Sequence, residues 1–127
     1  VGAAPGSPAA GSAGGRPVSL LGTYPTLNQL CDLRSVPHLD GESLTQFLED
    51  PSAASDRAVV TTQLRNNHAV RSQNWRYIRY ADGSEELYDH RVDKDEYHNL
   101  AGKAVHTAIK LQLAARLPKN NSQMDPP

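Results

Sequence analysis

Acidic and histidine side chains that could bind a metal occur at two places in the sequence. Asp93, Asp95 and Glu96 form a loose carboxylate cluster, and His38 precedes Asp40 in a loop. Calcium prefers such oxygen ligands, but an EF-hand alternates its ligands around a glycine, and the 93–96 cluster does not. A loop histidine beside a helix-capping carboxylate is common without a metal. We therefore predict a solvated turn, a capped loop and no metal site.

The only cysteine of the chain is Cys31. A single cysteine excludes an internal disulfide and a cysteine-rich metal site, and it leaves the cellular compartment open. Cys31 lies on the apolar side of a stretch with helical spacing, which is typical of a buried structural thiol. We therefore predict no catalytic nucleophile at this position.

Arginine and tyrosine alternate in the middle of the chain, a composition that can indicate a nucleic-acid surface. Acidic residues on the facing segments neutralise these arginines, and the whole chain has a net charge of −1. Cross-strand ion pairs explain the pattern better. No apolar run approaches the roughly 20 residues of a transmembrane helix. We therefore expect neither a nucleic acid nor a membrane as a partner.

The alternating residues must be positioned by a β-hairpin. Trp75–Tyr80 is rich in aromatic and branched residues, Asp82-Gly83 suits a type I′ turn, and Glu85–Asp89 is the returning strand. Period-two alternation gives two faces, neither of them purely apolar. We expect one face to pack against a helix and the other against something wider than this chain.

Two further strands and a helix complete this half. Ala58–Leu64 has strong β propensity, and His68–Gln73 follows after a short turn. From Gly102 or Lys103 to Leu117 the pattern is that of an amphipathic helix, with these residues on its apolar face: Val105, Ala108, Ile109, Leu113 and Leu117. The predicted fold is α+β, a four-stranded antiparallel sheet packed by a C-terminal helix.

The first half of the chain predicts helices and loops. Val18–Leu33 has one apolar stripe that we expect to be buried, and its regular helix should begin near Tyr24. At its end, Asp32 must adopt a left-handed conformation or let the helix end differently. Gly22 weakens the start of that helix. A short helix over Ser43–Leu48 is expected, capped by Asp40 or Gly41. Residues 1–17 and 118–127 have compositions that predict disorder.

Several segments of the chain form a set. They are Tyr24-Pro25-Thr26-Leu27, His38-Leu39-Asp40-Gly41, Asn67-His68-Ala69-Val70-Arg71-Ser72, Trp75-Arg76-Tyr77-Ile78-Arg79-Tyr80, Glu86-Leu87-Tyr88-Asp89 and Asn99-Leu100. The set resembles the C-terminal part of the formylglycine-dependent (type I) sulfatases, and is most similar to the iduronate-2-sulfatase-like and choline-sulfatase-like branch. The resemblance covers about Val18–Leu117. It implies that residues 18–57 are the tail of an α/β alkaline-phosphatase-like catalytic domain and residues 58–117 a C-terminal subdomain.

The resemblance also implies what a parent enzyme needs. Sulfatases of this family use a formylglycine made from a Cys/Ser-x-Pro-x-Arg motif, together with calcium, and this chain contains neither the motif nor the metal ligands. The chain is therefore expected not to be catalytic alone, and to close the fold of an enzyme acting on a sulfated small molecule or glycan. The parent would be compatible with a periplasmic or secreted location.

Three residues are implied by the resemblance as substrate-binding residues. His68, with Asn67, would hydrogen-bond a substrate hydroxyl or carboxylate, and Arg71 would pair with an anion. Local capping and pairing within a hairpin is the alternative for all three. Two alternatives also stand for the whole chain: a free-standing binding module that reuses the sheet-and-helix unit, and a non-functional relic.

Overall fold

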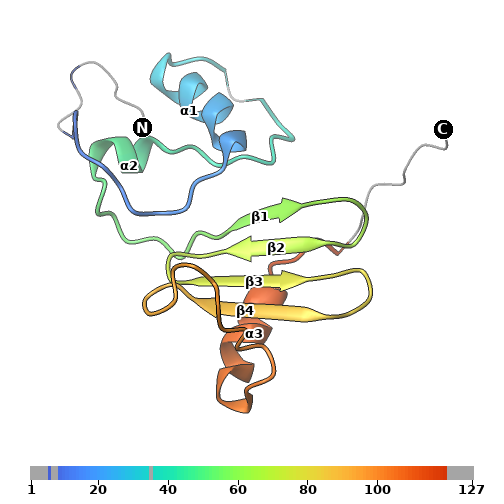
Figure 1. Cartoon of the computed structure of the whole chain (residues 1–127). Coiled ribbons are helices and arrows are strands. Elements are labelled where there is room, and N and C mark those ends of the chain that lie inside the picture. The colour runs from blue at the N-terminus through green and yellow to red at the C-terminus, as the bar shows by residue number, and fades with distance from the viewer. Residues whose placement is uncertain (1–5, 7–8, 35, 120–127) are drawn as a thin grey trace. The chain divides into compact units, whose positions relative to one another are not determined.

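The computed structural model describes residue 6 and residues 9–34 and 36–119. The chain divides into two compact units, with the boundary between Arg57 and Ala58 (Figure 1). The predicted disorder of residues 1–17 and 118–127 falls in part on positions 1–5, 7–8 and 120–127, which lie outside the described residues. None of the described helices is long and apolar enough to cross a membrane.

The second unit contains the predicted sheet. Its strands are β1 (Val59–Thr62), β2 (His68–Arg71), β3 (Trp75–Arg79) and β4 (Glu85–Asp89), all antiparallel and in the order β1-β2-β3-β4. A 3-10 turn, η2 (Ala104–His106), leads into the helix α3 (Thr107–Ala114), which packs on one face of this sheet. The predicted α+β architecture is confirmed, and each observed strand lies within or matches its predicted range.

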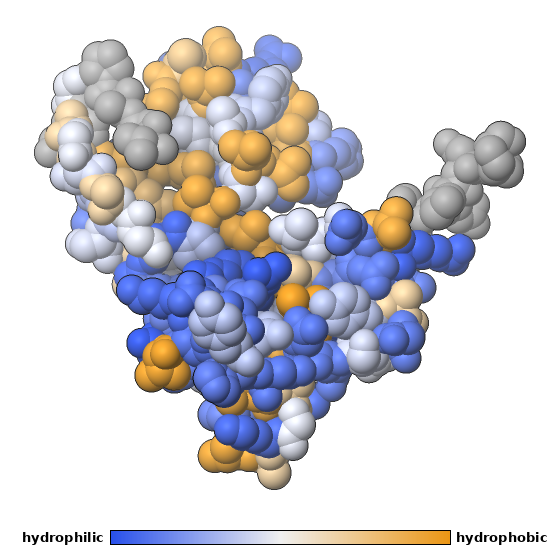
Figure 2. All heavy atoms as spheres, viewed as in Figure 1, coloured by the Kyte–Doolittle hydropathy of each residue, from blue (hydrophilic) through white to orange (hydrophobic). Residues whose placement is uncertain are grey.

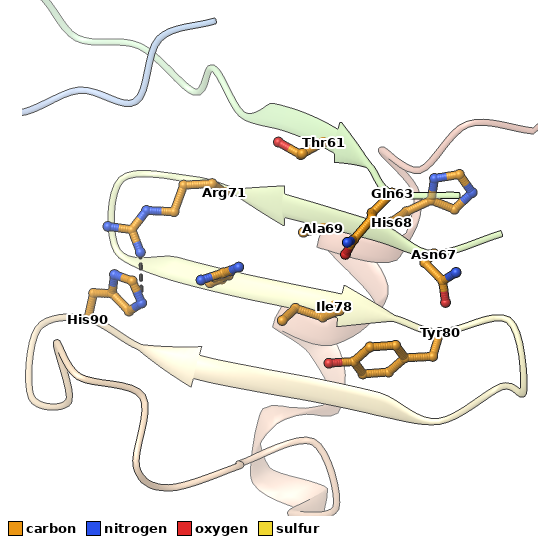
Figure 3. A pocket seen from close by; sticks show the side chains of 10 residues that line it. Thr61, Gln63, Asn67, His68, Ala69, Arg71, Ile78, Tyr80 and His90 are labelled. Atoms are coloured by element: carbon orange, nitrogen blue, oxygen red, sulfur yellow. Dashed lines mark hydrogen bonds between the residues drawn. The ribbon is translucent and has the colours of Figure 1, made fainter. Parts of the chain in front are cut away.

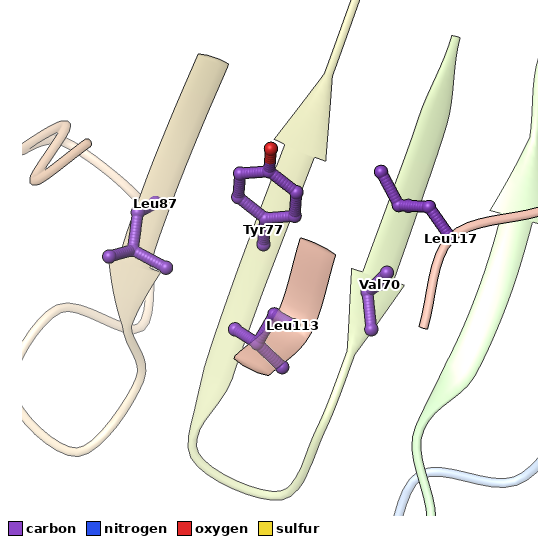
Figure 4. Packing of buried hydrophobic residues seen from close by; sticks show 5 residues of the cluster. All are labelled: Val70, Tyr77, Leu87, Leu113 and Leu117. Atoms are coloured by element: carbon purple, nitrogen blue, oxygen red, sulfur yellow. The ribbon is translucent and has the colours of Figure 1, made fainter. Parts of the chain in front are cut away.

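The core of the second unit lies between the sheet and α3 (Figure 4). Val70, Tyr77 and Leu87 stand opposite one another on β2, β3 and β4, and they are covered by Leu113 and Leu117. Side chains on a strand point alternately to the two faces of the sheet, so only one of the two sets packs against α3.

The predicted apolar face of the C-terminal helix is right in its second half and wrong at its start. Ile109 is half-buried and Leu113 and Leu117 are buried, but Val105 is 80% exposed and Ala108 is also exposed. The 3-10 turn explains Val105, because three residues per turn instead of 3.6 change the direction in which residues before Thr107 point. Ala108 lies within α3 itself.

The turn between β3 and β4 differs from the predicted type I′ turn. Gly83 has a φ of +86°, but Asp82 is not among the residues with positive φ, and type I′ needs both. The Gly83 N–H donates to the Tyr80 carbonyl at 3.0 Å, and the Tyr80 N–H donates to the Ser84 carbonyl at 3.0 Å. This is the three-residue hairpin loop in which a type I turn is followed by a left-handed glycine. The Asp82 carboxylate accepts hydrogen bonds from the Ser84 N–H and hydroxyl, and these bonds stabilise the loop.

The first unit consists of η1 (Leu20–Gly22), α1 (Thr23–Leu30) and α2 (Thr45–Glu49). Of the two alternatives for Asp32, the left-handed conformation is the one observed, with a φ of 49°. The predicted start and cap of the second helix are wrong: α2 begins at Thr45, and neither Asp40 nor Gly41 is its N-cap residue, which is Leu44. The Thr45 N–H donates to Ser43 Oγ at 3.3 Å. The backbone just before α2 is bound to α1 instead, because the Leu44 N–H donates to Thr26 Oγ1 of α1 at 2.8 Å.

The buried side of α1 is polar, which reverses the prediction. Thr26 and Asn28 are buried, whereas Leu20 is 91% exposed and Leu27 and Leu30 are about half exposed. Figure 2 shows hydrophobic residues gathered over this unit. Cys31 is also exposed and is not the buried thiol that its spacing predicted. Amphipathic periodicity identifies an apolar stripe, but it does not say that this stripe is covered within the same chain.

Gly22 has a different role from the one predicted. A Cβ on Gly22 would lie 2.6 Å from the Glu42 carbonyl oxygen, and one on Gly41 would overlap the Leu21 carbonyl. Two segments of backbone therefore cross where neither has a side chain. The glycine at position 22 allows this crossing, in addition to its cost at the start of the helix.

Candidate binding site on the open face of the sheet

The face of the sheet opposite α3, here called the open face, is formed by the residues that alternate with the core row. Arg71 pairs with Arg76, which in turn pairs with Tyr88, and Ile78 lies between Ala69 and Glu86. A shallow depression of about 360 Å³ lies over this face (Figure 3). It is lined by residues of β1, β2 and β3, by the turn after β1, by Tyr80 after β3 and by His90 after β4.

Four ionisable side chains meet at one end of the depression. Arg71 Nη1 lies 2.8 Å from His90 Nε2, the contact drawn as a dashed line in Figure 3. The same Nε2 atom lies 2.6 Å from Glu96 Oε1. The other oxygen of Glu96 accepts from Arg76 at 2.9 Å. The Glu96 carboxylate thus contacts Arg76 on β3 and His90 after β4 directly, and it is linked to Arg71 on β2 through His90.

Arg71 differs from Arg76, the other arginine of this cluster. Among the described side chains, His90 is the single hydrogen-bond partner of its guanidinium, whereas Arg76 has an ion pair with Glu96. Partial burial lowers the pKa of Arg71 from its usual value, with the nearby Glu96 opposing that shift and Arg76 adding to it. The guanidinium has other N–H donors that this contact does not use. Arg71 is therefore the residue of the open face best suited to hold an oxyanion.

Asn67, predicted to contact substrate, borders the depression, and its side-chain amide is engaged at both ends. Its Oδ1 accepts from the Ala81 N–H at 3.0 Å, and its Nδ2 donates to the Arg65 carbonyl at 3.3 Å. The bond from Ala81 links the β1–β2 turn to the β3–β4 turn, and the bond to Arg65 lies within the β1–β2 turn. Asn67 therefore holds the two hairpin ends together at the rim.

His68, the second predicted contact, also borders the depression but belongs to the core row of β2. Its side chain is only 3% exposed, two residues before the buried Val70, and its Nδ1 lies 2.9 Å from Thr62 Oγ1 on β1. The structure thus brings Asn67, His68 and Arg71 to one depression while separating the functional atoms of His68 from the open face. Of these three predicted residues, only Arg71 presents charged donors to the open face.

His90, Glu96 and Arg76 are the residues that sequence reasoning missed as a site. Glu96 was interpreted as part of a solvated turn, and its positive φ of 61° could not be read from the sequence. Glu96 is separated from Arg71 and Arg76 by more than a hairpin, so no spacing rule connects the three residues. Only their hydrogen bonds reveal the cluster.

A second group of polar side chains lies on β4 of the same face. Tyr88 Oη donates to Glu86 Oε2 at 3.0 Å. Burial first, and then this hydrogen bond, raise the pKa of Tyr88 to about 12. Burial and the Glu86 charge also raise the pKa of Tyr80, which borders the depression. Both phenols therefore stay neutral hydrogen-bonding groups at ordinary pH.

The side chains that line the depression are suited to binding an anion. The depression is lined by two arginines, the side-chain amides of Asn67 and Gln63, and the ring of Tyr80, and such groups suit an anionic polar molecule. Among residues 9–34 and 36–119, no three His, Cys, Asp or Glu side chains come together as a metal site. The depression contains no cysteine or serine beside a base.

Comparison with known proteins gives the family context. No protein-family model matches the chain. A curated protein of Formosa agariphila named sulfatase is 37% identical over 109 residues, which cover 86% of this chain and 22% of that protein. The solved structure of a 2-O GAG sulfatase is 26% identical with a TM-score of 0.56, covering 72% of this chain and 22% of the other.

A third match has a different chemical name. The structure of a phosphonate monoester hydrolase of Agrobacterium radiobacter is 25% identical with a TM-score of 0.56, covering 74% of this chain and 23% of the other. The chain therefore spans about a fifth of the length of the proteins it matches.

Proposed function

Because this chain corresponds to the C-terminal part of a sulfatase-family protein, we propose that it completes the fold of an enzyme that hydrolyses sulfuric esters and is not catalytic alone. The observation that carries the proposal is the 37% identity to the Formosa agariphila sulfatase over most of the chain. The four-stranded sheet with its packing helix supports it.

The catalytic groups would come from parts of the parent enzyme outside these residues. The nearest approach to a formylglycine motif, Ser35-Val36-Pro37-His38-Leu39, has leucine where the motif has arginine. Among the described residues no three His, Cys, Asp or Glu side chains come together, and we assign formylglycine and calcium to the rest of the parent enzyme. We assign residues 18–57 to the end of the catalytic domain and 58–117 to the C-terminal subdomain. The division of the chain after Arg57 supports this assignment.

The substrate proposed for the parent is a sulfated sugar, with the open-face depression at one edge of its binding cleft. A matching structure is a 2-O GAG sulfatase, and this favours the iduronate-2-sulfatase-like branch over the choline-sulfatase-like one. Arg71 would contact an anionic group of the sugar. The direct contacts predicted for Asn67 and His68 stay predictions, and their hydrogen bonds favour a role in holding the rim.

A second candidate reaction is hydrolysis of phosphonate monoesters, which the match to the Agrobacterium radiobacter enzyme favours. That match equals the 2-O GAG sulfatase in TM-score and falls one point below it in identity. The sulfatase proposal ranks first because of the higher identity of the Formosa agariphila protein.

A chimera tests the function. The matching C-terminal segment of the Formosa agariphila sulfatase is replaced by this chain, and the protein is produced with formylglycine installed. We expect a sulfate ester to be hydrolysed and a phenylphosphonate monoester to be hydrolysed much more slowly, with the truncated sulfatase as an inactive control. A folded chimera with confirmed formylglycine but no sulfate-ester hydrolysis would refute the proposal, and the reverse selectivity would favour the second candidate.

A further inference from the structure

His90 Nε2 is shared between two partners that require opposite proton positions. Arg71 has only N–H donors, so a hydrogen bond from Arg71 needs a lone pair on Nε2. The Glu96 carboxylate is an acceptor, so a hydrogen bond to Glu96 needs a proton on Nε2. One ring nitrogen cannot do both at once. The contacts at 2.8 Å and 2.6 Å therefore mark two alternative bonding states of one cluster.

We propose that His90 and Glu96 are positioning residues that make oxyanion binding by Arg71 depend on protonation of His90. In the neutral ring with its proton on Nδ1, Nε2 accepts from Arg71 and holds the guanidinium against the side of the depression. In the protonated ring, Nε2–H donates to Glu96, and the imidazolium repels Arg71. The guanidinium then turns its donors to an oxyanion in the depression.

The charges around His90 support this two-state behaviour. Arg71 comes from β2, Arg76 from β3, Tyr88 from β4 and Glu96 from the segment after β4. Thr61 and Gln63, which line the depression from β1 and the turn after it, are uncharged. Arg76 remains bound to Glu96 in either state, since its contact uses the carboxylate and not the imidazole. The proton on His90 therefore changes the partner of Arg71 and leaves the Arg76 pair in place.

The ligand is an oxyanion carried by a sugar, either a sulfate ester or a ring carboxylate. Its assignment as part of a sulfated sugar rests on the proposed function, whereas the protonation dependence rests on the four side chains alone. Histidine changes its charge between about pH 5 and 8, so the binding of the oxyanion should change over this interval.

Nuclear magnetic resonance of the full chain tests the inference. The Arg71 Nε–Hε signal is followed during titration with inorganic sulfate, and in a separate series with glucuronate, at constant ionic strength kept with sodium chloride. We expect sulfate to bind about tenfold more tightly near pH 5 than near pH 8. By linkage, saturating sulfate should raise the titration midpoint of the His90 ring protons by about one pH unit. Binding of glucuronate alone would identify a carboxylate as the ligand.

Matched variants separate this effect from general surface charge. His90→Gln should remove the pH dependence, and Arg71→Gln should remove binding, whereas His98→Gln and Arg65→Gln, at exposed positions, should change neither. Dispersed amide spectra would show that each variant is folded. The inference is overturned if the affinity is equal at both pH values, if its pH dependence persists in His90→Gln, or if neither anion binds Arg71.

The result is independent of the chimera experiment. An inactive chimera combined with pH-dependent binding at Arg71 would refute the proposed function and keep the switch. An active chimera with pH-independent binding would refute the switch alone.

Discussion

Lys110 Nζ of α3 lies 2.7 Å from Glu85 Oε2 of β4, so a charged pair joins the helix to the sheet beside the apolar core. The other oxygen of Glu85 accepts from the Tyr77 hydroxyl, and Lys110 also donates to the Ala101 carbonyl at 3.3 Å. Burial and then Glu85 raise the pKa of Tyr77, which keeps that phenol a donor. The hydrogen bonds among Lys110, Glu85 and Tyr77 thus fix the position of α3 on the sheet at the edge of the small apolar core.

Lys110→Met tests this network. Methionine keeps most of the apolar part of the lysine side chain but removes the ammonium group that pairs with Glu85. We therefore expect the free energy of unfolding to fall by about 1 kcal/mol. Urea unfolding followed by Trp75 fluorescence measures the change. Lys103→Met, at an exposed position, is the matched control. Equal midpoints for the two variants would show that the pair does not stabilise the packing of α3.

The stability of the second unit should depend on acid pH. Lys110 and then Tyr77 lower the pKa of Glu85, and Arg91 lowers the pKa of Asp89 through a hydrogen bond. Unfolded carboxyls bind protons near pH 4, above these folded values, so the stabilisation is present above that pH and is lost as pH falls through the folded values.

Glu85→Gln should flatten this acid dependence, because glutamine does not titrate. Thermal unfolding between about pH 3 and pH 7 measures it. Asp95→Asn removes one exposed carboxyl and provides the control for net charge. An unchanged slope in Glu85→Gln would exclude Glu85 as a source of the acid sensitivity.

Gly41→Ala tests the backbone crossing in the first unit. A Cβ at this position would overlap the Leu21 carbonyl, so one of the two segments must move, at a cost of about 1–3 kcal/mol. Hydrogen exchange should accelerate at the Leu44 amide, whose partner is Thr26 Oγ1. Gly102→Ala, where a Cβ would meet no atom within 4 Å, should leave exchange at this amide unchanged. Slow exchange in both variants would count against the crossing.

Leu113→Ala tests how much of the second unit depends on its small core. Leu113 is 2% exposed and packs with Val70, Tyr77 and Leu87, so its truncation should cost about 2–5 kcal/mol. Such a loss is a large share of the stability of a small domain. Denaturant unfolding should show a large drop for Leu113→Ala and a small one for the exposed Leu111→Ala. Similar losses in both would contradict the observed packing of α3.

Local patterns in the sequence are sufficient to predict the secondary-structure elements of the second unit. Branched and aromatic runs with period two predicted the four strands, and the glycine at position 83 identified the hairpin between β3 and β4. Leu113 and Leu117 were recognised as core because helical spacing continues through them. These features depend on neighbouring residues, so a single sequence contains the information.

The tertiary structure decided which side chains meet. Arg71, His90 and Glu96 come together only because β2, β3 and the segment after β4 have one particular register and path. The burial of Thr26 in place of the apolar stripe on α1 likewise depends on which segment crosses that helix, here one containing Gly41. Periodicity identifies the faces of an element, but packing between distant segments decides which face is covered. The candidate site therefore could not be assembled from the sequence, although the strands that position it could.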